Sequence, residues 1–207
     1  MKRTKISTST DSAHTKRENT AGYTKTRALA ESAILIALAF ILSWIRLWRM
    51  PQSGSVTAVS MLPLIIIGIR HGPYWGTGSG IVYGLLQLLQ GGGLFSPAQT
   101  LGSYTLEFVL DYLVAFGVMG LSFLFRRKKN GLLIAVPVCI ALRFLCHLVS
   151  GVVVWYPYAP EGQNIWLYSA VYNGSYLAVE IVITAIVAFA LLRVAPLRKL
   201  LRAGARK

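Results

Sequence analysis

The chain has 207 residues, of which 55% are hydrophobic and only 14% are charged, and its formal net charge is +14. Soluble domains carry about 25% charged residues, and here the apolar residues gather in long blocks with the charges between them. This pattern excludes an ordinary water-soluble domain and predicts a multi-span membrane protein. Because the basic residues lie at the ends of apolar runs, the positive charge indicates membrane topology and argues against a nucleic-acid partner.

The apolar runs, taken in chain order, predict an all-α membrane protein with a bundle of six transmembrane helices over residues 27–195. Residues 1–26 are polar and are expected to form a disordered tail. They do not resemble a signal peptide, because no apolar stretch follows the first basic residues closely. The predicted spans are about 27–48, a short block at 56–69, 73–90, 99–125, 131–155 and 166–194, and a basic tail follows at 196–207.

The third predicted span is rich in small residues, which at helical spacing let neighbouring helices approach closely. These residues are Gly76, Gly78, Gly80 and Gly84.

The distribution of Lys and Arg predicts the orientation of the spans. Of the 21 basic residues, 18 lie in the N-terminal tail, around residue 70, in the 126–129 cluster or in the C-terminal tail, and the exceptions are Arg46, Arg49 and Arg143. With six spans these four segments share one side, so the positive-inside rule places both termini in the cytoplasm. The loops at 49–55, 91–98 and 156–165 are then expected outside.

Ionisable residues inside the predicted spans are the first candidates for function, because such residues are costly in a bilayer. Glu107 and Asp111 lie four residues apart in the fourth span, and Arg143 and His147 lie four residues apart in the fifth. Each pair therefore shares one face of its helix. One interpretation is structural, an ion pair between Arg143 and one of the two carboxylates.

The stretch WYPYAPEGQNIWLYSAVYNGSY, which begins at Trp155, holds seven aromatic residues. Trp155 follows His147 by eight residues, about two helical turns, and Tyr168 and Asn173 lie in the outer part of the sixth span. Rings, an amide and the Glu107 carboxylate together suit a planar, hydrogen-bonding, positively charged ligand. The alternative is an interfacial aromatic belt, which would not require the asparagine or the glutamate.

Other features of the sequence argue against catalysis and against a resident cofactor. There is no Walker A motif, no Gly-x-Ser-x-Gly and no convincing pair of nucleophile and base, so we expect no enzyme activity. No metal-ligand cluster is apparent. Cys139 and Cys146 would lie about 10 Å apart on one helix, too far for a disulfide, so packing is expected. Glu31, near the cytoplasmic end of the first span, is interpreted as structural, and Glu180 lies in the sixth span.

Several stretches together resemble a known family. They are PQSGSVTAVSMLPLIIIGIRHGPYWG, YGLLQLL, LDYLVAFGVMGL, RFLCHLVSGVVVW and YSAVYNGSY, in this order. Over residues 27–195 the chain resembles the thiamine-specific substrate-binding (S) component of bacterial energy-coupling-factor vitamin transporters. The resemblance implies a multi-pass subunit of the bacterial cell membrane that captures thiamine from outside. It also implies a separate transmembrane coupling protein and two ATPase subunits as partners.

The resemblance also implies which residues bind the vitamin. In that family a carboxylate faces the thiazolium cation, a histidine and a tryptophan contact the aminopyrimidine ring, and a tyrosine and an asparagine supply hydrogen bonds. Phe108 stands where the family pattern has a tyrosine, so no hydroxyl contact is expected there. The residues carried over are Glu107, Arg143, His147, Trp155, Tyr168, Asn173 and, in the first loop, Trp48.

Ala33 and Ala37 match the small-residue stripe with which the first helix of such families contacts the coupling protein. The alternative for these alanines is packing inside the chain. Two alternatives to thiamine capture stay open: an S component for another vitamin or precursor, such as riboflavin or the pyrimidine precursor of thiamine, and a non-transport membrane protein. Biotin is disfavoured because it is anionic and Glu107 is too.

Overall fold

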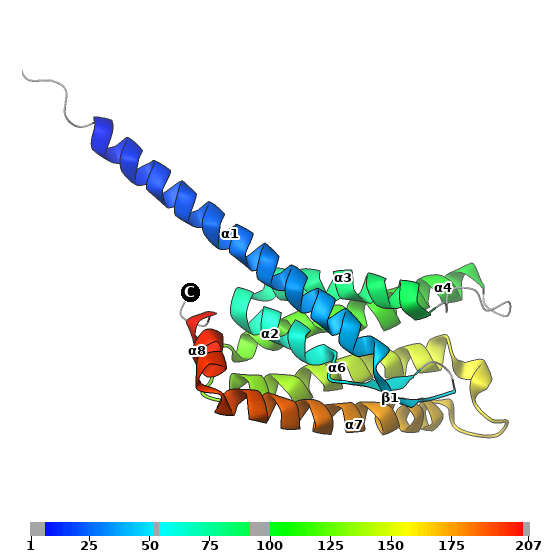
Figure 1. The fold of residues 1–207 in the computed structure, drawn as a ribbon. Helices are drawn as coiled ribbons and strands as arrows, with labels where there is room; N and C mark the ends of the chain where they lie inside the picture. The colour runs from blue at the N-terminus through cyan, green and yellow to red at the C-terminus, as the bar shows by residue number, and fades with distance from the viewer. Residues whose placement is uncertain (1–6, 52–53, 92–99, 205–207) are drawn as a thin grey trace, which may run out of the picture.

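The computed structural model describes the backbone of residues 7–51, 54–91 and 100–204, and side chains within residues 25–201 of these ranges. The protein is a bundle of helices with one small β-hairpin (Figure 1). Its elements are α1 (Ser7–Trp44), β1 (Arg46–Arg49), β2 (Ser55–Thr57), α2 (Met61–His71), α3 (Pro73–Gly91), α4 (Leu101–Glu107), the π-helical η2 (Phe108–Val114), α5 (Ala115–Gly117), the 3-10 helix η3 (Val118–Phe125), α6 (Gly131–Val153), η4 (Tyr156–Tyr158), α7 (Ile165–Arg193) and α8 (Ala195–Gly204).

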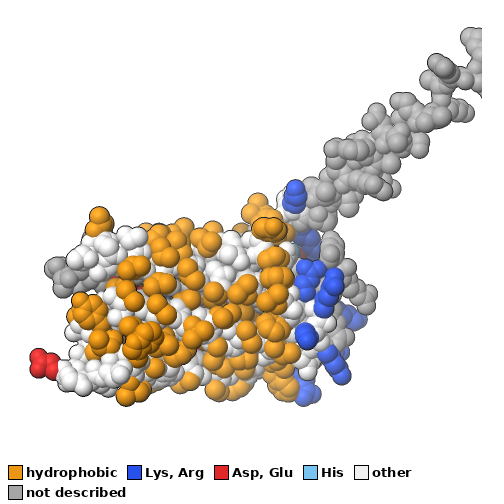
Figure 2. All heavy atoms as spheres, turned by 180° about the vertical axis from the view of Figure 1, so that it is seen from behind, with side chains coloured by type: hydrophobic (Ala, Val, Ile, Leu, Met, Phe, Trp, Pro, Cys, Tyr) orange, Lys and Arg blue, Asp and Glu red, His pale blue; other side chains and the backbone are white. Residues whose placement is uncertain are grey.

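Within the described residues, four helical segments are long and apolar enough to cross a membrane: Lys25–Trp44, Leu101–Phe125, Gly131–Val153 and Ile165–Arg193. Exposed apolar side chains cover most of the face of the bundle seen in Figure 2, and Lys and Arg gather at one end of it. A water-soluble monomer does not expose a patch of this size. The protein is therefore an integral membrane protein.

The two ends of the bundle differ in the residues that they carry. The basic end holds Arg70, the turn at 126–129 and α8, and the hairpin end holds β1 and β2 (Figures 1 and 2).

The first loop differs from the expectation of an all-α protein. The first span ends at Trp44 and not at Trp48, because residues 46–49 form β1, which pairs antiparallel with β2. The predicted block at 56–69 divides accordingly into β2 and the 11-residue α2. Strand pairing depends on a partner distant in the sequence, so helical periodicity alone could not reveal it. The expected loop at 91–98 lies outside the described residues except for Gly91.

Both expected tails are helical where the structure describes them. The backbone of α1 is already helical at Ser7, where the sequence suggested a disordered tail to residue 26, and α8 occupies most of the expected C-terminal tail. Residues 1–6 and 205–207 lie outside the described part of the chain.

The glycines of α3 bring it against the segment from η2 to η3. A Cβ built on Gly80 would lie 2.2 Å from the carbonyl oxygen of Phe116, and one on Gly84 would lie 2.4 Å from that of Tyr112. Gly78 faces open space, with nothing within 4 Å. The prediction of close approach is thus confirmed for three of the four glycines, and we call this contact the glycine seam: Gly76, Gly80 and Gly84.

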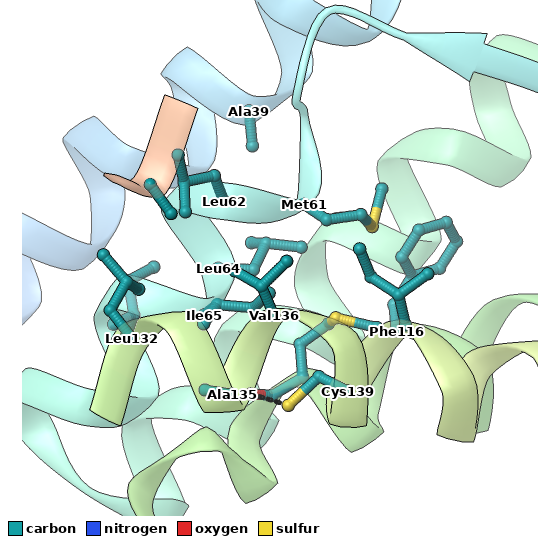
Figure 3. Close-up of a cluster of buried hydrophobic side chains, with 14 of the residues drawn as sticks. Ala39, Met61, Leu62, Leu64, Ile65, Phe116, Leu132, Ala135, Val136 and Cys139 are labelled. Carbon is teal, nitrogen blue, oxygen red and sulfur yellow. Dashed lines mark hydrogen bonds between the residues drawn. The ribbon is translucent and has the colours of Figure 1, made fainter. Parts of the chain in front are cut away.

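The core lies where α2 crosses α6 and η3 (Figure 3). Leu64 and Ile65 of α2 are fully buried, as are Val136 and Cys139 of α6. Both cysteines are free, and Cys139 is buried among apolar side chains, so the prediction of packing in place of a disulfide is confirmed.

At the basic end one carboxylate joins three elements. Glu31 of α1 accepts hydrogen bonds from Arg70 and from Arg27, the latter at 2.8 Å, and its other contact is His71 Nε2 at 2.8 Å. Arg70 also donates to the carbonyl oxygen of Leu200 in α8 at 2.6 Å. Glu31 therefore has the structural role expected of it, which is to hold α1, α2 and α8 together.

Candidate ligand-binding site

A cavity lies at the hairpin end of the bundle, bounded by the first loop, α3, the α4–η2 segment, α6 and α7. The side chains that line it combine two carboxylates, two guanidinium groups and several aromatic rings. Six of the seven predicted site residues line it: Glu107, Arg143, His147, Trp155, Tyr168 and Asn173.

Trp48 is the predicted residue that the structure does not bring to the cavity wall. It lies in β1 opposite Val56, its side chain is 47% exposed, and it is absent from the cavity lining. The first loop reaches the cavity with other residues, among them Arg46 and Thr57. Regular alternation would put Arg46 and Trp48 on one side of the strand, but the pairing with β2 is irregular between these two residues, and a local irregularity of this kind cannot be predicted from the sequence.

Asp111 is the acceptor at the centre of the site. Its Oδ1 lies 2.7 Å from His147 Nδ1, and its Oδ2 accepts from Ser150 at 2.6 Å and from the indole N–H of Trp155 at 3.1 Å. The π-helical turn η2 carries Asp111, and such turns are frequent at functional sites. One carboxylate thus fixes the end of α6 and orients the tryptophan ring that follows it.

His147 connects this carboxylate to Arg143. Arg143 Nε donates to His147 Nε2 at 3.1 Å, so Nε2 is the acceptor and the ring proton on Nδ1 is donated to Asp111. The guanidinium carbon of Arg143 also lies 4.7 Å from the centroid of the Phe116 ring. Of the two ion pairs that the sequence suggested for Arg143, the one with Asp111 is replaced by an arrangement in which His147 lies between the arginine and the carboxylate.

Glu107 brings a second carboxylate to the cavity. It is the last residue of α4, directly before η2, and only 2% of its surface is exposed. A carboxylate this well buried in a membrane protein is costly unless cations or hydrogen-bond donors surround it. Glu107 and Asp111 are thus two acidic side chains that line the cavity.

Asn173 holds α7 against α6 from inside the cavity wall. Its amide nitrogen donates to the carbonyl oxygen of His147 at 3.2 Å and to that of Ser169 at 3.0 Å. Its amide oxygen accepts from the hydroxyl of Tyr176 at 3.0 Å. The structure thus gives Asn173 a positioning role, and its oxygen retains one lone pair for a ligand.

Side chains of α7 hold the hairpin in place over this end. Glu180 accepts from the backbone N–H of Thr57 at 2.8 Å and from its hydroxyl at 2.9 Å. The hydroxyl of Tyr172 accepts from the backbone N–H of Gly54 at 3.2 Å. Glu180, another ionisable residue that the sequence places in a span, is thus explained as an anchor for β2.

Several lining residues were not singled out from the sequence as site residues. On α3 they are Tyr83 and Gln87, four residues apart on one helix face, a spacing that could have revealed them. The others are Arg46, Tyr112, Tyr172 and Tyr176. From the sequence, Asp111 was a candidate partner of Arg143 but was not included among the predicted ligand-binding residues.

Comparison with known proteins places the chain in a family. A profile of the thiamine transporter protein family (Thia_YuaJ) matches residues 29–199. The chain belongs to this family. The thiamine transporter ThiT of Bacillus subtilis is 33% identical over 183 residues, which is 81% of this chain and 91% of that protein. ThiT of Lacticaseibacillus paracasei is 31% identical over 186 residues, which is 81% of this chain and 88% of that protein.

A solved structure of ThiT from Listeria monocytogenes has the same architecture as this member of the thiamine transporter family. It superposes with a TM-score of 0.71 at 25% sequence identity, covering 86% of this chain and 98% of that one. The family resemblance drawn from the sequence is confirmed, and the relatives are named as transporters and not as enzymes.

Proposed function

We propose that this protein binds thiamine with high affinity on the outer side of the bacterial cell membrane and presents it for uptake. The observation that carries the proposal is the cavity at the hairpin end, where two carboxylates and an oriented tryptophan line one space in a chain of the thiamine transporter family. Thiamine combines a cationic thiazolium ring with a flat aminopyrimidine. Carboxylates balance the cation, and aromatic faces stack on flat rings and attract positive charge.

In the proposed binding mode, Glu107 faces the thiazolium ring and Trp155 stacks on the aminopyrimidine. His147 contacts the aminopyrimidine as well, while Tyr168 and the free lone pair of Asn173 offer hydrogen bonds. Arg143 lines the cavity and acts through His147. Thiamine is then the transported ligand and not a resident cofactor.

We further propose that the protein is the S component of an energy-coupling-factor transporter, with a transmembrane coupling protein and two ATPase subunits as partners. The absence of a Walker A motif from the sequence supports a division of labour in which other subunits hydrolyse ATP. Ala33 and Ala37 are exposed on α1, whereas Ala39 is fully buried. This exposure argues against internal packing of the two alanines and suits contact with a partner helix.

The proposed topology has six spans and both termini in the cytoplasm. At 11 residues, α2 rises about 16 Å, too short to cross a bilayer alone, but the hairpin continues it toward the other end (Figure 1). In a background with both native cysteines replaced by alanine, Lys128→Cys and Glu161→Cys should react with a membrane-impermeant thiol reagent from opposite sides. Labelling of both positions in intact cells would contradict this topology.

The proposed function is tested by titrating the purified protein with thiamine and following tryptophan fluorescence and heat. Riboflavin and the pyrimidine precursor of thiamine serve as comparison ligands. We expect thiamine to bind most tightly. Tighter binding of a comparison ligand would assign the site to that compound, and lack of binding to all of them by folded protein would refute capture of a vitamin at this site.

A further inference from the structure

A second cavity lies at the basic end, far from the site at the hairpin end. It is bounded by the ends of α2, η3 and α7, by the start of α6, and by α8. The wall is apolar and is formed by Ile69, Phe125, Leu132, Leu133, Leu192 and Leu201. The lining includes no Asp or Glu. It carries five cationic side chains, namely Arg126, Lys128, Lys129, Arg193 and Arg198.

No acidic side chain that the structure describes at this end neutralises these cations. The acidic residue there is Glu31, and its carboxylate is already bound by Arg70, His71 and Arg27. Five cations gathered around one apolar space repel one another unless an anion lies between them. Four of these side chains are exposed and Arg126 is partly buried, so an anion that entered the cavity would be attracted by all five.

Arg126 provides an independent sign of a missing partner. Its Nε is buried, yet it has no hydrogen-bond partner among the described residues. Burying a donor without an acceptor is unfavourable, and for a charged group more so. An anionic oxygen that entered the cavity would satisfy this N–H with a charge-assisted hydrogen bond.

The start of α6 favours an anion at the same place. Its first three residues, Gly131 to Leu133, line the cavity, and the side chain of Asn130 makes no capping hydrogen bond to the helix. The N-terminus of this 23-residue helix carries a partial positive charge, although the backbone N–H groups of Gly131 and Leu133 already donate to the carbonyl oxygens of Lys128 and Asn130. Helix dipole, guanidinium groups and ammonium groups thus converge on one space.

The positive-inside rule explains why Lys and Arg are frequent at this end, but it requires neither a cavity nor an apolar wall beneath the charges. We propose that this cavity binds an anionic phospholipid, with the phosphate among the cations and an acyl chain along the apolar wall. Basic pockets between helices on the cytoplasmic side suit such headgroups. The amphipathic α8, with Leu201 on the cavity wall and Arg198 at its rim, would close the site toward the membrane surface.

A matched pair of double variants tests this proposal. Arg126→Gln/Arg198→Gln removes two cavity cations, and Arg127→Gln/Lys199→Gln removes two neighbouring exposed cations that do not line the cavity. Native mass spectrometry of the detergent-purified protein measures binding of phosphatidylglycerol and phosphatidylcholine. We expect wild type to prefer phosphatidylglycerol, and the cavity variant to bind it roughly 10- to 30-fold more weakly. The control variant should stay within about threefold of wild type, because its two cations do not line the cavity and act on a bound phosphate only at longer range, where salt screens them.

A competition arm distinguishes a lipid from a soluble phosphate. sn-Glycerol 3-phosphate at millimolar concentration should not displace phosphatidylglycerol, because it lacks the acyl chain for the apolar wall; displacement would reassign the site to soluble phosphates and overturn the lipid proposal. Equal losses in the two double variants, or equal binding of the two lipids by wild type, would also overturn it.

A monodisperse elution profile and an unchanged thermal midpoint show that each variant is folded. If the cavity variant unfolds, Arg126→Lys is used instead, which keeps the charge but loses the Nε donor, with Arg127→Lys as its control. We expect Arg126→Lys to bind phosphatidylglycerol about fivefold more weakly than wild type, and equal losses in the two variants would overturn the proposal.

Discussion

Replacing Asp111 by asparagine tests the hydrogen-bond network that orients the proposed thiamine site. The carboxylate accepts from three donors, namely His147, Ser150 and Trp155. An amide of the same shape has one acceptor oxygen and one nitrogen that only donates. If the oxygen stays with His147, the nitrogen faces the indole N–H of Trp155. If the amide is reversed, His147 must move its proton to Nε2, where it meets the Nε donor of Arg143.

Either arrangement loses at least one hydrogen bond to a charged acceptor, a change of about 1.5–3 kcal/mol. Part of this loss lowers the stability of the free protein, and part appears in binding, because the tryptophan ring must then be ordered when the ligand arrives. We expect the dissociation constant for thiamine to rise about 5- to 30-fold, equivalent to about 1–2 kcal/mol. Removal of a negative charge near a cationic ligand acts in the same direction.

Isothermal titration calorimetry at one pH measures the effect, with two variants as controls. Ser150→Ala removes one donor and leaves the carboxylate with its other two partners, so a change of less than about threefold is expected. Trp155→Phe keeps a flat ring but loses the N–H, and its effect should lie between those of Ser150→Ala and Asp111→Asn. Binding of thiamine by folded Asp111→Asn at wild-type affinity would refute the orienting role of this residue.

Three further predictions concern binding, packing and coupling. Glu107→Gln should weaken thiamine binding by about 1–3 kcal/mol, and unchanged affinity in calorimetry would remove the carboxylate from the proposed binding mode. Gly80→Ala should lower the stability by about 1–3 kcal/mol in thermal unfolding, since its Cβ would meet a backbone oxygen. Gly78→Ala, the control, should leave the stability equal or raise it by up to ~1 kcal/mol. Equal unfolding midpoints for the two variants would contradict the glycine seam. Ala33→Trp and Ala37→Trp should abolish uptake in cells but preserve thiamine binding by the purified protein, and loss of binding would place these residues in the core instead.

The helices could be predicted from the sequence because each long apolar run is a local signal. The runs that became α6 and α7 were located to within a few residues, and the pairing of Glu107 with Asp111 on one side followed from helical spacing alone. The six cavity residues were then brought together by the family resemblance, since spacing within one helix does not show which helices are neighbours.

What the sequence did not reveal depends on contacts between distant segments. The strand at residues 46–49 exists because β2 pairs with it, and its apolar, arginine-flanked sequence is also compatible with the end of a span. The role of Asp111 was missed for a similar reason, because nothing local distinguishes it from Glu107 as the partner of His147. The same limit applies to Trp48, which follows an irregularity in the pairing of β1 with β2.

The glycine seam makes one wall of the proposed thiamine cavity stiff. Interfaces between side chains adjust by changing rotamers, but backbone atoms already in contact have no such freedom. The part of α3 that carries Tyr83 and Gln87 is therefore expected to be a rigid wall of the cavity. The facing hairpin is held by hydrogen bonds to side chains, including the one from the backbone N–H of Gly54 to the hydroxyl of Tyr172, and such bonds can break individually. If one wall of the cavity moves when a ligand enters or leaves, we therefore expect it to be the hairpin and not α3.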